Sequence, residues 1–364
     1  MPYRLILPLV AIFGTLMNQS SQAGDLERIK VSEDRSHFVG EKSGQKVSIW
    51  GFNYDRDDQG RLLEDYWAEE WPTVAEDFRE MKNLGANVVR VHLQLHRFMK
   101  DAQQPDEANL ARLARLIKLA EETGVYLDLT GLGCYHKKEV PAWYQTLAET
   151  DRWEVQARFW KAIARVSPAS PAIFCYDLMN EPILDGGKDD KDWLPGEGLG
   201  GKHYVQRITI DRKGRTDQEI AKAWVESMTR AIRSVDGRSM ITVGVIPWAQ
   251  VFPGARPLFH SPEVGKTLDF VSIHLYPRAG KLEEDITALK VYQVGKPIVI
   301  EEFFPLSASF EETEAFMTRA KPIVAGWMSF YWGKTIEENE KKGDISGALV
   351  AGWLKRFRAL SAVK

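Results

Sequence analysis

Short apolar runs alternate with amphipathic stretches along most of the chain. Each run is nearly continuous in its apolar character, which is typical of strands buried on both faces. Eight such runs are found, at residues 47–53, 87–93, 125–130, 172–179, 240–246, 269–275, 297–301 and 324–331. The pattern therefore predicts a sheet whose strands are covered on both sides.

The segments between these runs have the spacing of helices. Apolar residues recur at helical intervals in residues 73–84, 108–123, 152–166 and 217–235. Gly85 and Gly124 stand just past two of them, where helices commonly end. Alternating strands and helices predict an α/β fold, and eight repeats over this length predict a (β/α)₈ TIM barrel. A doubly wound open sheet is the structural alternative.

Two further segments belong to this predicted single domain of residues 24–364. Residues 36–45 predict an N-terminal β-hairpin that covers the bottom of the barrel. Residues 183–216 form a long connection after the fourth strand, where a barrel enzyme carries its chemistry. Such a loop is expected to close one end of a groove.

The first 23 residues have the pattern of an export signal. Arg4 supplies a positive start, residues 5–17 are mostly apolar, and Ser21 and Ala23 are small residues before the expected cut. The apolar run is too short to span a bilayer comfortably, which disfavours the alternative of a membrane anchor. We expect a cleaved signal peptide at 1–23 and a secreted protein, periplasmic or extracellular.

Composition narrows the possible functions. The chain has 48 Lys and Arg against 51 Asp and Glu, so it lacks the positive charge of a nucleic-acid binder. The seven histidines are dispersed, and no phosphate-binding glycine loop follows a strand, so neither a metal nor another cofactor is expected. Cys134 and Cys175 are expected to be packed free thiols. The 12 tryptophans suit a large core or a carbohydrate site.

Two glutamates stand where apolar strands open into loops. Glu181 follows the fourth run and Glu302 follows the seventh. Barrel enzymes place their chemistry at these strand ends. Hydrolysis of a glycosidic bond needs one protonated carboxyl group and one ionised carboxylate. The pair therefore predicts a sugar-cleaving site.

The motifs around both glutamates resemble those of glycoside hydrolase family 5, the cellulase-like family of retaining barrel glycosidases. Asn180-Glu181-Pro182 matches its fourth-strand motif, and residues 296–303 match its seventh-strand motif. The resemblance covers roughly residues 36–335. It implies a β-linked sugar substrate, with Glu181 as acid/base and Glu302 as nucleophile.

The resemblance also assigns supporting residues near the nucleophile. It implies that Arg90 supports Glu302 and that Asn180 binds the 2-hydroxyl of the sugar. A guanidinium beside Glu302 would keep that carboxylate ionised. Glu301 stands where the family usually has a small residue, and strand alternation places it on the opposite side from Glu302.

Three more positions follow from the same resemblance. His274 and Tyr276 match a His-x-Tyr motif, in which the histidine orients the acid/base and the tyrosine hydroxyl binds the nucleophile. Trp332 matches the aromatic platform under the attacked sugar.

The chain also departs from the family pattern. The third strand lacks the histidine that relatives often carry, and Tyr135 or His136 could fill its place. His92 stands where the cellulases commonly have proline, so we expect His92 to line the pocket. His92 and Asn53 are both expected to contact substrate. These departures leave the sugar and the choice between endo and exo action open.

Together these observations predict a secreted retaining β-glycosidase acting on a β-linked glucan, mannan or oligosaccharide. A transglycosylase would use the same residues, and a non-catalytic carbohydrate-binding barrel is the other alternative. The expected partner is the carbohydrate substrate, with no nucleic acid, no membrane after signal cleavage and no obligatory protein partner.

Overall fold

The computed structural model describes residues 26–184, 191–330 and 332–362. The predicted signal peptide lies outside these residues. Among the helices in the described residues, none is long and apolar enough to cross a bilayer.

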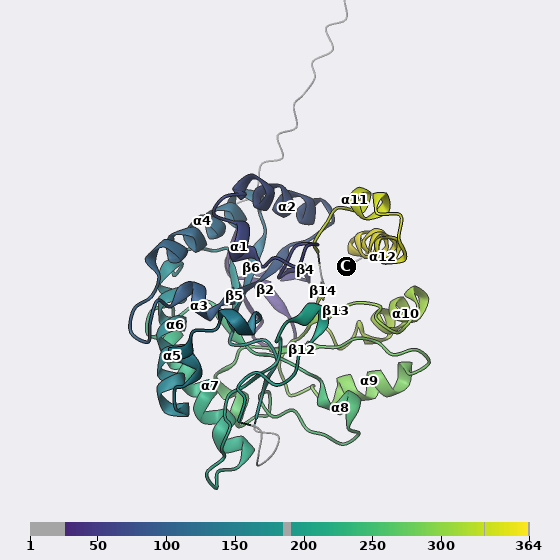
Figure 1. The fold of residues 1–364 in the computed structure, drawn as a ribbon. Helices are drawn as coiled ribbons and strands as arrows, with labels where there is room; N and C mark the ends of the chain where they lie inside the picture. The colour runs from purple at the N-terminus through teal and green to yellow at the C-terminus, as the bar shows by residue number, and fades with distance from the viewer. Residues whose placement is uncertain (1–25, 185–190, 331, 363–364) are drawn as a thin grey trace, which may run out of the picture.

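One parallel sheet forms the centre of the molecule (Figure 1). Its order is β10-β7-β6-β5-β4-β14-β13-β12-β11. The two outermost members, β10 and β11, are successive parts of one chain segment separated only by Val243, so the sheet closes on itself. The strands are β4 (Ile49–Tyr54), β5 (Val88–Gln94), β6 (Tyr126–Gly133), β7 (Ile173–Asp177), β10 (Met240–Thr242), β11 (Gly244–Val245), β12 (Val271–His274), β13 (Ile298–Phe303) and β14 (Gly326–Ser329).

Helices surround this barrel, as Figure 1 shows. The (β/α)₈ TIM barrel predicted from the sequence is therefore confirmed, and the open-sheet alternative is wrong. The helices are α1 (Leu63–Tyr66), α2 (Trp71–Asn83), α3 (Leu95–Phe98), α4 (Glu107–Thr123), α5 (Ala142–Gln145), α6 (Glu149–Val166), α7 (Asp217–Arg233), α8 (Trp248–Val251), α9 (Leu282–Lys290), α10 (Phe310–Ala320), α11 (Ile336–Lys341) and α12 (Ile345–Ser361).

Local sequence explains where these helices begin and end. The Asp106 side chain accepts a hydrogen bond from the Asn109 amide, which caps the first turn of α4. Gly124 ends the same helix with φ 71°, a left-handed conformation that glycine adopts without steric cost. At α7, Thr216 and Glu219 cap each other's backbone amides.

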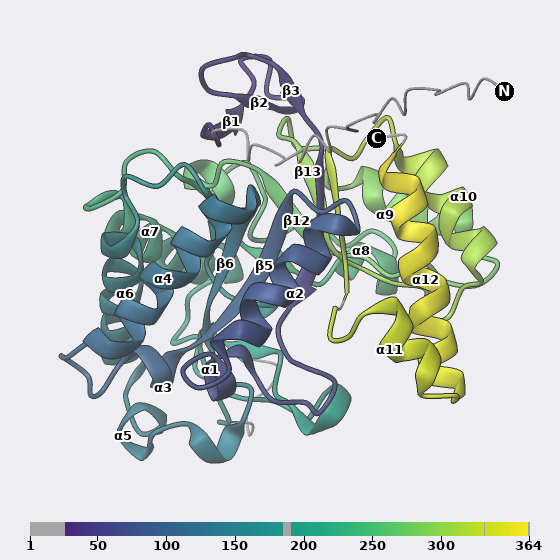
Figure 2. The same ribbon diagram turned by 90° about the horizontal axis from the view of Figure 1, so that it is seen from above.

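An antiparallel sheet covers one end of the barrel (Figure 2). It contains β1 (Ile29–Val31), β2 (Phe38–Gly40) and β3 (Lys46–Val47). Phe38 packs edge-on against Phe174 and Phe270, each with ring centres 5.3 Å apart. These partners lie near the starts of barrel strands, so the predicted hairpin does cover the bottom of the barrel, with one additional strand.

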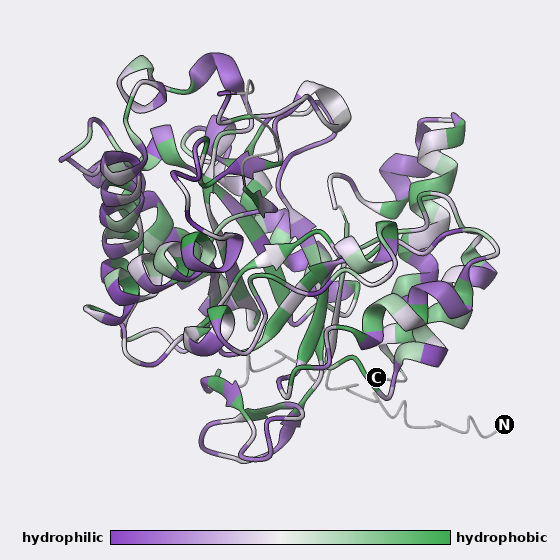
Figure 3. Cartoon of the chain, turned by 90° about the horizontal axis from the view of Figure 1, so that it is seen from below, coloured by the Kyte–Doolittle hydropathy of each residue, from purple (hydrophilic) through white to green (hydrophobic). Residues whose placement is uncertain are grey.

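Apolar side chains fill the space between strands and helices. In Figure 3 the central strands are mostly hydrophobic, whereas the outer helices carry many hydrophilic positions. Cys134 and Cys175 are both buried and free, as predicted. Several tryptophans, including Trp160, Trp224 and Trp353, are fully buried, so core packing accounts for part of the tryptophan excess.

Candidate active site

Glu181 stands in the turn that follows β7. Its φ is 47°, a left-handed conformation that is uncommon for a residue with a side chain and is frequent at functional sites. The Glu181 amide donates a hydrogen bond of 2.9 Å to the Gly244 carbonyl oxygen, which ties the turn to the fifth strand. The fold thereby fixes the backbone of this carboxyl group before any substrate arrives.

Glu302 lies near the end of β13, opposite His274 of β12. The register of β13 shifts against β14 between Ile300 and Phe303. Because of this irregularity, Glu301 does not point away from Glu302 as strict alternation predicts. Glu301 is also inside the barrel, with one oxygen 3.6 Å from Arg90 Nε and 3.5 Å from His274 Nε2. The expected separation of the two carboxylates is therefore wrong.

Arg90 is fully buried in the middle of these groups. Its Nη1 donates to Glu302 Oε1 at 2.7 Å and to Asn53 Oδ1 at 2.9 Å. Its Nη2 donates to Asp177 Oδ2 at 2.8 Å and to Asn180 Oδ1 at 2.9 Å. One guanidinium thus joins side chains from the first, fourth and seventh strands of the barrel or their ends.

Tyr276 and His274 complete the surroundings of the two glutamates. The Tyr276 hydroxyl donates to Glu302 Oε2 at 2.6 Å. His274 Nδ1 is 3.0 Å from Glu181 Oε1 and 3.5 Å from Glu302 Oε1. The structure therefore places the tyrosine on one glutamate and the histidine on the other, in the arrangement that the resemblance implies.

The charges around Glu302 and His274 determine the protonation states of these two side chains. Burial alone acts to raise the pKa of Glu302, but the charges of His274 and Arg90, with the Tyr276 hydroxyl, lower the pKa below its ordinary value. Burial acts to lower the pKa of His274, but the surrounding glutamates raise it to about 10. Near neutral pH, Glu302 is a carboxylate and His274 is an imidazolium.

The spacing of the glutamates determines what chemistry they can perform. One oxygen of Glu181, one of Glu302 and one ring nitrogen of His274 all lie within 4.8 Å of one another. Retaining glycosidases hold their carboxyl groups about 5–5.5 Å apart, whereas inverting enzymes need about 6.5–9.5 Å. The short spacing leaves no room for a water molecule on the far side of the sugar, so it suits direct attack by Glu302.

Among the residues that the structure describes, two groups of side chains have the spacing of metal ligands. One is Glu181 with His274 and Glu302, and the other is Asp128 with Cys175 and Glu301. A cation in either group would be repelled by the buried guanidinium, which is 2.7 Å from Glu302 and 3.6 Å from Glu301.

The residues expected to touch substrate have different surroundings. Asn53 Nδ2 donates to the Glu301 and Ser329 carbonyl oxygens, and its Oδ1 accepts from Arg90, so its amide is committed to the barrel. Trp332 is buried beside it, and the Trp332 amide donates to the Asn53 carbonyl at 2.8 Å. The indole Nε1 of Trp332 has no hydrogen-bond partner among the described residues.

His92 and Tyr135 form a pair at the ends of the second and third strands. His92 Nδ1 shares a hydrogen bond of 2.5 Å with the Tyr135 hydroxyl. Burial and the Arg90 charge hold the pKa of His92 well below its ordinary value, so its ring is neutral. Of the two residues considered for the missing third-strand histidine, Tyr135 therefore reaches the site through His92.

Sequence reasoning missed four residues near the site. Asp177 pairs with Arg90 and accepts hydrogen bonds from Thr130 and the Gly244 amide. A carboxylate inside an apolar strand was a visible signal for this residue. The others are Asp55, Arg56 and Tyr204, which come from loops and have no such signal.

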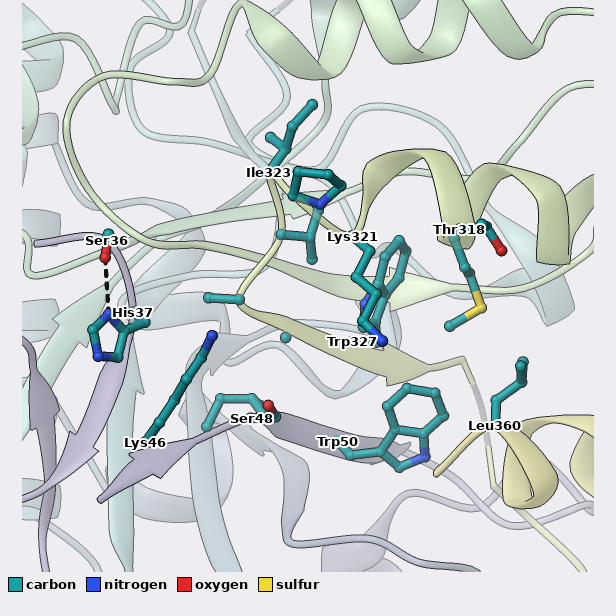
Figure 4. A pocket seen from close by; sticks show the side chains of 16 residues that line it. Ser36, His37, Lys46, Ser48, Trp50, Thr318, Lys321, Ile323, Trp327 and Leu360 are labelled. Atoms are coloured by element: carbon teal, nitrogen blue, oxygen red, sulfur yellow. Dashed lines mark hydrogen bonds between the residues drawn. The ribbon is translucent and has the colours of Figure 1, made fainter. Parts of the chain in front are cut away.

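A separate cavity of about 380 Å³ opens at the other end of the barrel, beside β3 and the start of β14 (Figure 4). Lys46, Lys321 and Trp327 lie along it, and Ser36 and His37 share a hydrogen bond at its edge. None of its described lining residues is an aspartate or glutamate. It therefore lacks the carboxyl chemistry found at the strand ends.

Comparison with known proteins gives one match by sequence and several by structure. The model of the cellulase family, glycosyl hydrolase family 5, matches residues 41–334. No curated protein matches the chain. Among solved structures, an exo-β-1,4-mannosidase from Opitutaceae bacterium strain TAV5 aligns with a TM-score of 0.65 and 19% identity, covering 92% of this chain. The chain spans 62% of that protein, less than two thirds of its length.

Two other solved structures show the same fold over nearly their full length. A β-1,4-D-mannanase from Cryptopygus antarcticus has a TM-score of 0.60 and 18% identity, with 92% of this chain and 94% of that chain covered. The catalytic domain of an endoglucanase from Thermobifida fusca has a TM-score of 0.57 and 15% identity, with 91% and 98% covered.

Proposed function

Because the chain belongs to glycosyl hydrolase family 5 and is a glycoside hydrolase, we propose that it cleaves β-glycosidic bonds with retention through Glu302 and Glu181. The observation that carries the proposal is the short spacing of these two carboxyl groups around His274. Arg90 and Tyr276 hold Glu302 as an anion, which a nucleophile requires.

The reaction has two displacements. A Glu302 oxygen attacks the anomeric carbon while the bond to the leaving oxygen breaks, and Glu181 gives its proton to that oxygen. Water then attacks the glycosyl-enzyme, Glu181 takes a proton from the water, and Glu302 leaves as a carboxylate. His274 donates from Nδ1 to one Glu181 oxygen, which leaves the other oxygen for proton transfer.

The anomeric form of the first product tests the mechanism. With an aryl β-glycoside, NMR spectra recorded within the first turnovers are expected to show the β-sugar before mutarotation. An α-sugar as first product would exclude the double displacement. Glu302→Gln is expected to lose activity by a factor of about 10⁴ or more, because the covalent step has no nucleophile.

The substrate class is also part of the proposal. Two similar structures are named as an exo-β-1,4-mannosidase and a β-1,4-D-mannanase, so we propose β-1,4-manno-oligosaccharides as the substrate class. β-1,4-Gluco-oligosaccharides are tested beside them. Hydrolysis of the manno-series with a kcat/KM at least tenfold higher would support the assignment, and the reverse ratio would contradict it.

We further propose that residues 1–23 are removed on export and that the mature chain begins at Gly24. The N-terminal sequence of the protein recovered outside the cytoplasm tests this directly. A full-length chain retained with the cells would contradict it.

A further inference from the structure

Residues 191–216, between β8 (Pro182–Ile183) and α7, cross part of the barrel mouth. The His203 amide donates to the Tyr135 carbonyl at 2.9 Å, and Gln206 Nε2 donates to the Leu132 carbonyl at 2.8 Å. Asn180 Nδ2 donates to the Tyr204 carbonyl at 3.2 Å. His203 and Gln206 are buried. This part of the connection is therefore fixed to the third and fourth strands.

The first strand meets the same connection from the other side. Arg56 Nη1 is 2.7 Å from Asp55 Oδ2 and donates to the Tyr204 hydroxyl at 3.0 Å. The Arg56 guanidinium also lies over the Phe330 ring, 5.4 Å from its centre. Tyr204 packs against Tyr135 with ring centres 4.9 Å apart. Arg56, Tyr204, Tyr135 and Phe330 thus form a continuous barrier, here called the Arg56–Tyr204 wall.

Asp55, which is bonded to Arg56 of this wall, is fully buried. Its Oδ2 is paired with Arg56, but its Oδ1 has no hydrogen-bond partner among the described residues. A buried carboxylate oxygen without a donor is costly, so such atoms usually await a ligand or water. A sugar hydroxyl is a donor of the right kind.

The positions of the two glutamates show which part of the substrate meets the wall. Glu181 protonates the leaving oxygen, so the leaving sugar lies on the side of β7. The attacked sugar lies on the other side, towards Trp332, whose amide is bonded to Asn53, two residues before Asp55. The wall therefore stands beyond the attacked sugar, where its non-reducing side would continue.

The exposure of the glutamates agrees with a narrow site. The Glu181 side chain is 17% exposed and the Glu302 side chain 8% exposed.

On the basis of the proposed function, we infer that Asp55 and Arg56 bind hydroxyls of the sugar at the non-reducing end, and that the Arg56–Tyr204 wall excludes any further sugar on that side. The enzyme then removes one sugar at a time from the ends of β-linked oligosaccharides. Neither Asp55 nor Arg56 reacts with substrate, so both determine specificity.

Pentasaccharides labelled at the reducing end test the wall. The wild-type protein is expected to form labelled tetrasaccharide and free monosaccharide first. The double variant Arg56→Ala, Tyr204→Ala is expected to form labelled di- and trisaccharides from the start, because the wall is open. Tyr204→Phe, which removes only the hydroxyl, keeps the ring packing and is expected to give a smaller share of these products.

The matched control is Arg61→Ala. Arg61 belongs to the same loop but pairs with Asp57 and Glu70 instead of Tyr204. This variant is expected to keep the wild-type product pattern. Internal cleavage by the wild-type protein, or an unchanged pattern in a folded double variant, would overturn the wall.

A deoxygenated substrate tests Asp55 without relying on a variant alone. Removing the hydroxyl that Asp55 binds is expected to lower the wild-type kcat/KM about 10- to 100-fold, but to have little effect in Asp55→Ala, which has no side-chain acceptor. Each hydroxyl of the terminal sugar is removed in turn. If removal of each sugar hydroxyl lowers kcat/KM equally in the wild type and the variant, the role of Asp55 is overturned. If no β-glycoside is hydrolysed at all, the proposed function fails instead.

Discussion

Arg90 shows at the scale of one residue how charge organises the site. Its guanidinium is buried and bonded to Glu302, Asp177, Asn180 and Asn53. Removing one partner of a buried ion pair costs about 3–5 kcal/mol, because the remaining charge stays unpaired. Glu302 and Asp177 would both be left in this state.

Replacement of Arg90 by methionine is therefore expected to affect stability and activity together. Urea unfolding should show that the free energy of unfolding falls by about 3–5 kcal/mol. Because Arg90 lowers the pKa of Glu302, the acid limb of the kcat/KM profile should move to higher pH in the variant. An unchanged acid limb would show that Arg90 does not control the ionisation of Glu302.

His274 gives a second prediction at this scale, for stability against pH. Its pKa is about 10 in the folded protein, above the ordinary value of about 6.5. The folded state keeps a proton that the unfolded state loses, so this contribution is complete below about pH 6.5 and declines as pH rises towards 10.

Urea unfolding of the wild type and of His274→Gln measures this contribution. Between about pH 6.5 and 8.5, the free energy of unfolding of the wild type should fall by on the order of 2 kcal/mol more than that of the variant. This pH range lies below the ordinary pKa of the two cysteines. His37→Gln, at a half-buried bend outside the active site, is the control and should follow the wild type. Parallel curves for wild type and His274→Gln would contradict the imidazolium.

At the scale of elements, the strands could be predicted more fully than their irregularities. The apolar runs gave all eight barrel strands, because strands buried on both faces need continuous apolar character. The break at Val243 and the register shift in β13 depend on neighbouring strands and have no signal in either segment alone. Glu301 was placed wrongly for that reason.

The same limit applied to the site. Glu181, Glu302 and their supporting residues stand at strand ends, which the pattern identifies. Arg56 and Tyr204 are 148 residues apart in two loops, and only the folded chain brings them together.

Gly244, at the start of β11, carries the prediction at this scale. A Cβ atom here would lie 2.5 Å from His274 Nε2 and 2.6 Å from Glu301 Oε2. Gly244→Ala is therefore expected to displace His274 and to lower kcat/KM about 100-fold or more, with about 1–3 kcal/mol lost in stability. Gly237→Ala, with nothing within 4 Å of its Cβ, should change neither. Full activity in Gly244→Ala would show that His274 tolerates displacement.

At the scale of the whole molecule, the two ends of the barrel have separate tasks. The sheet of β1–β3 closes the end where the strands begin, and the carboxyl groups lie at the end where the strands finish. Substitutions under the sheet should therefore change stability without changing the chemistry.

Phe38→Ala tests this division. The ring is fully buried between Phe174 and Phe270, so its loss is expected to cost about 3–5 kcal/mol of stability. Urea unfolding measures that cost, and kcat/KM at a temperature where the variant is folded should stay within about twofold of wild type. A large loss of kcat/KM in the folded variant would show that the two ends are coupled.

The position of Arg90 also has a consequence for how the enzyme matures. Its partners come from the first, fourth and seventh strands, so they meet it only after distant parts of the chain have assembled. A half-assembled chain has no fixed Glu302 anion and cannot attack a sugar. Recovery of activity during refolding should therefore follow assembly of the first, fourth and seventh strands around Arg90, and the enzyme stays inactive until these strands are in place.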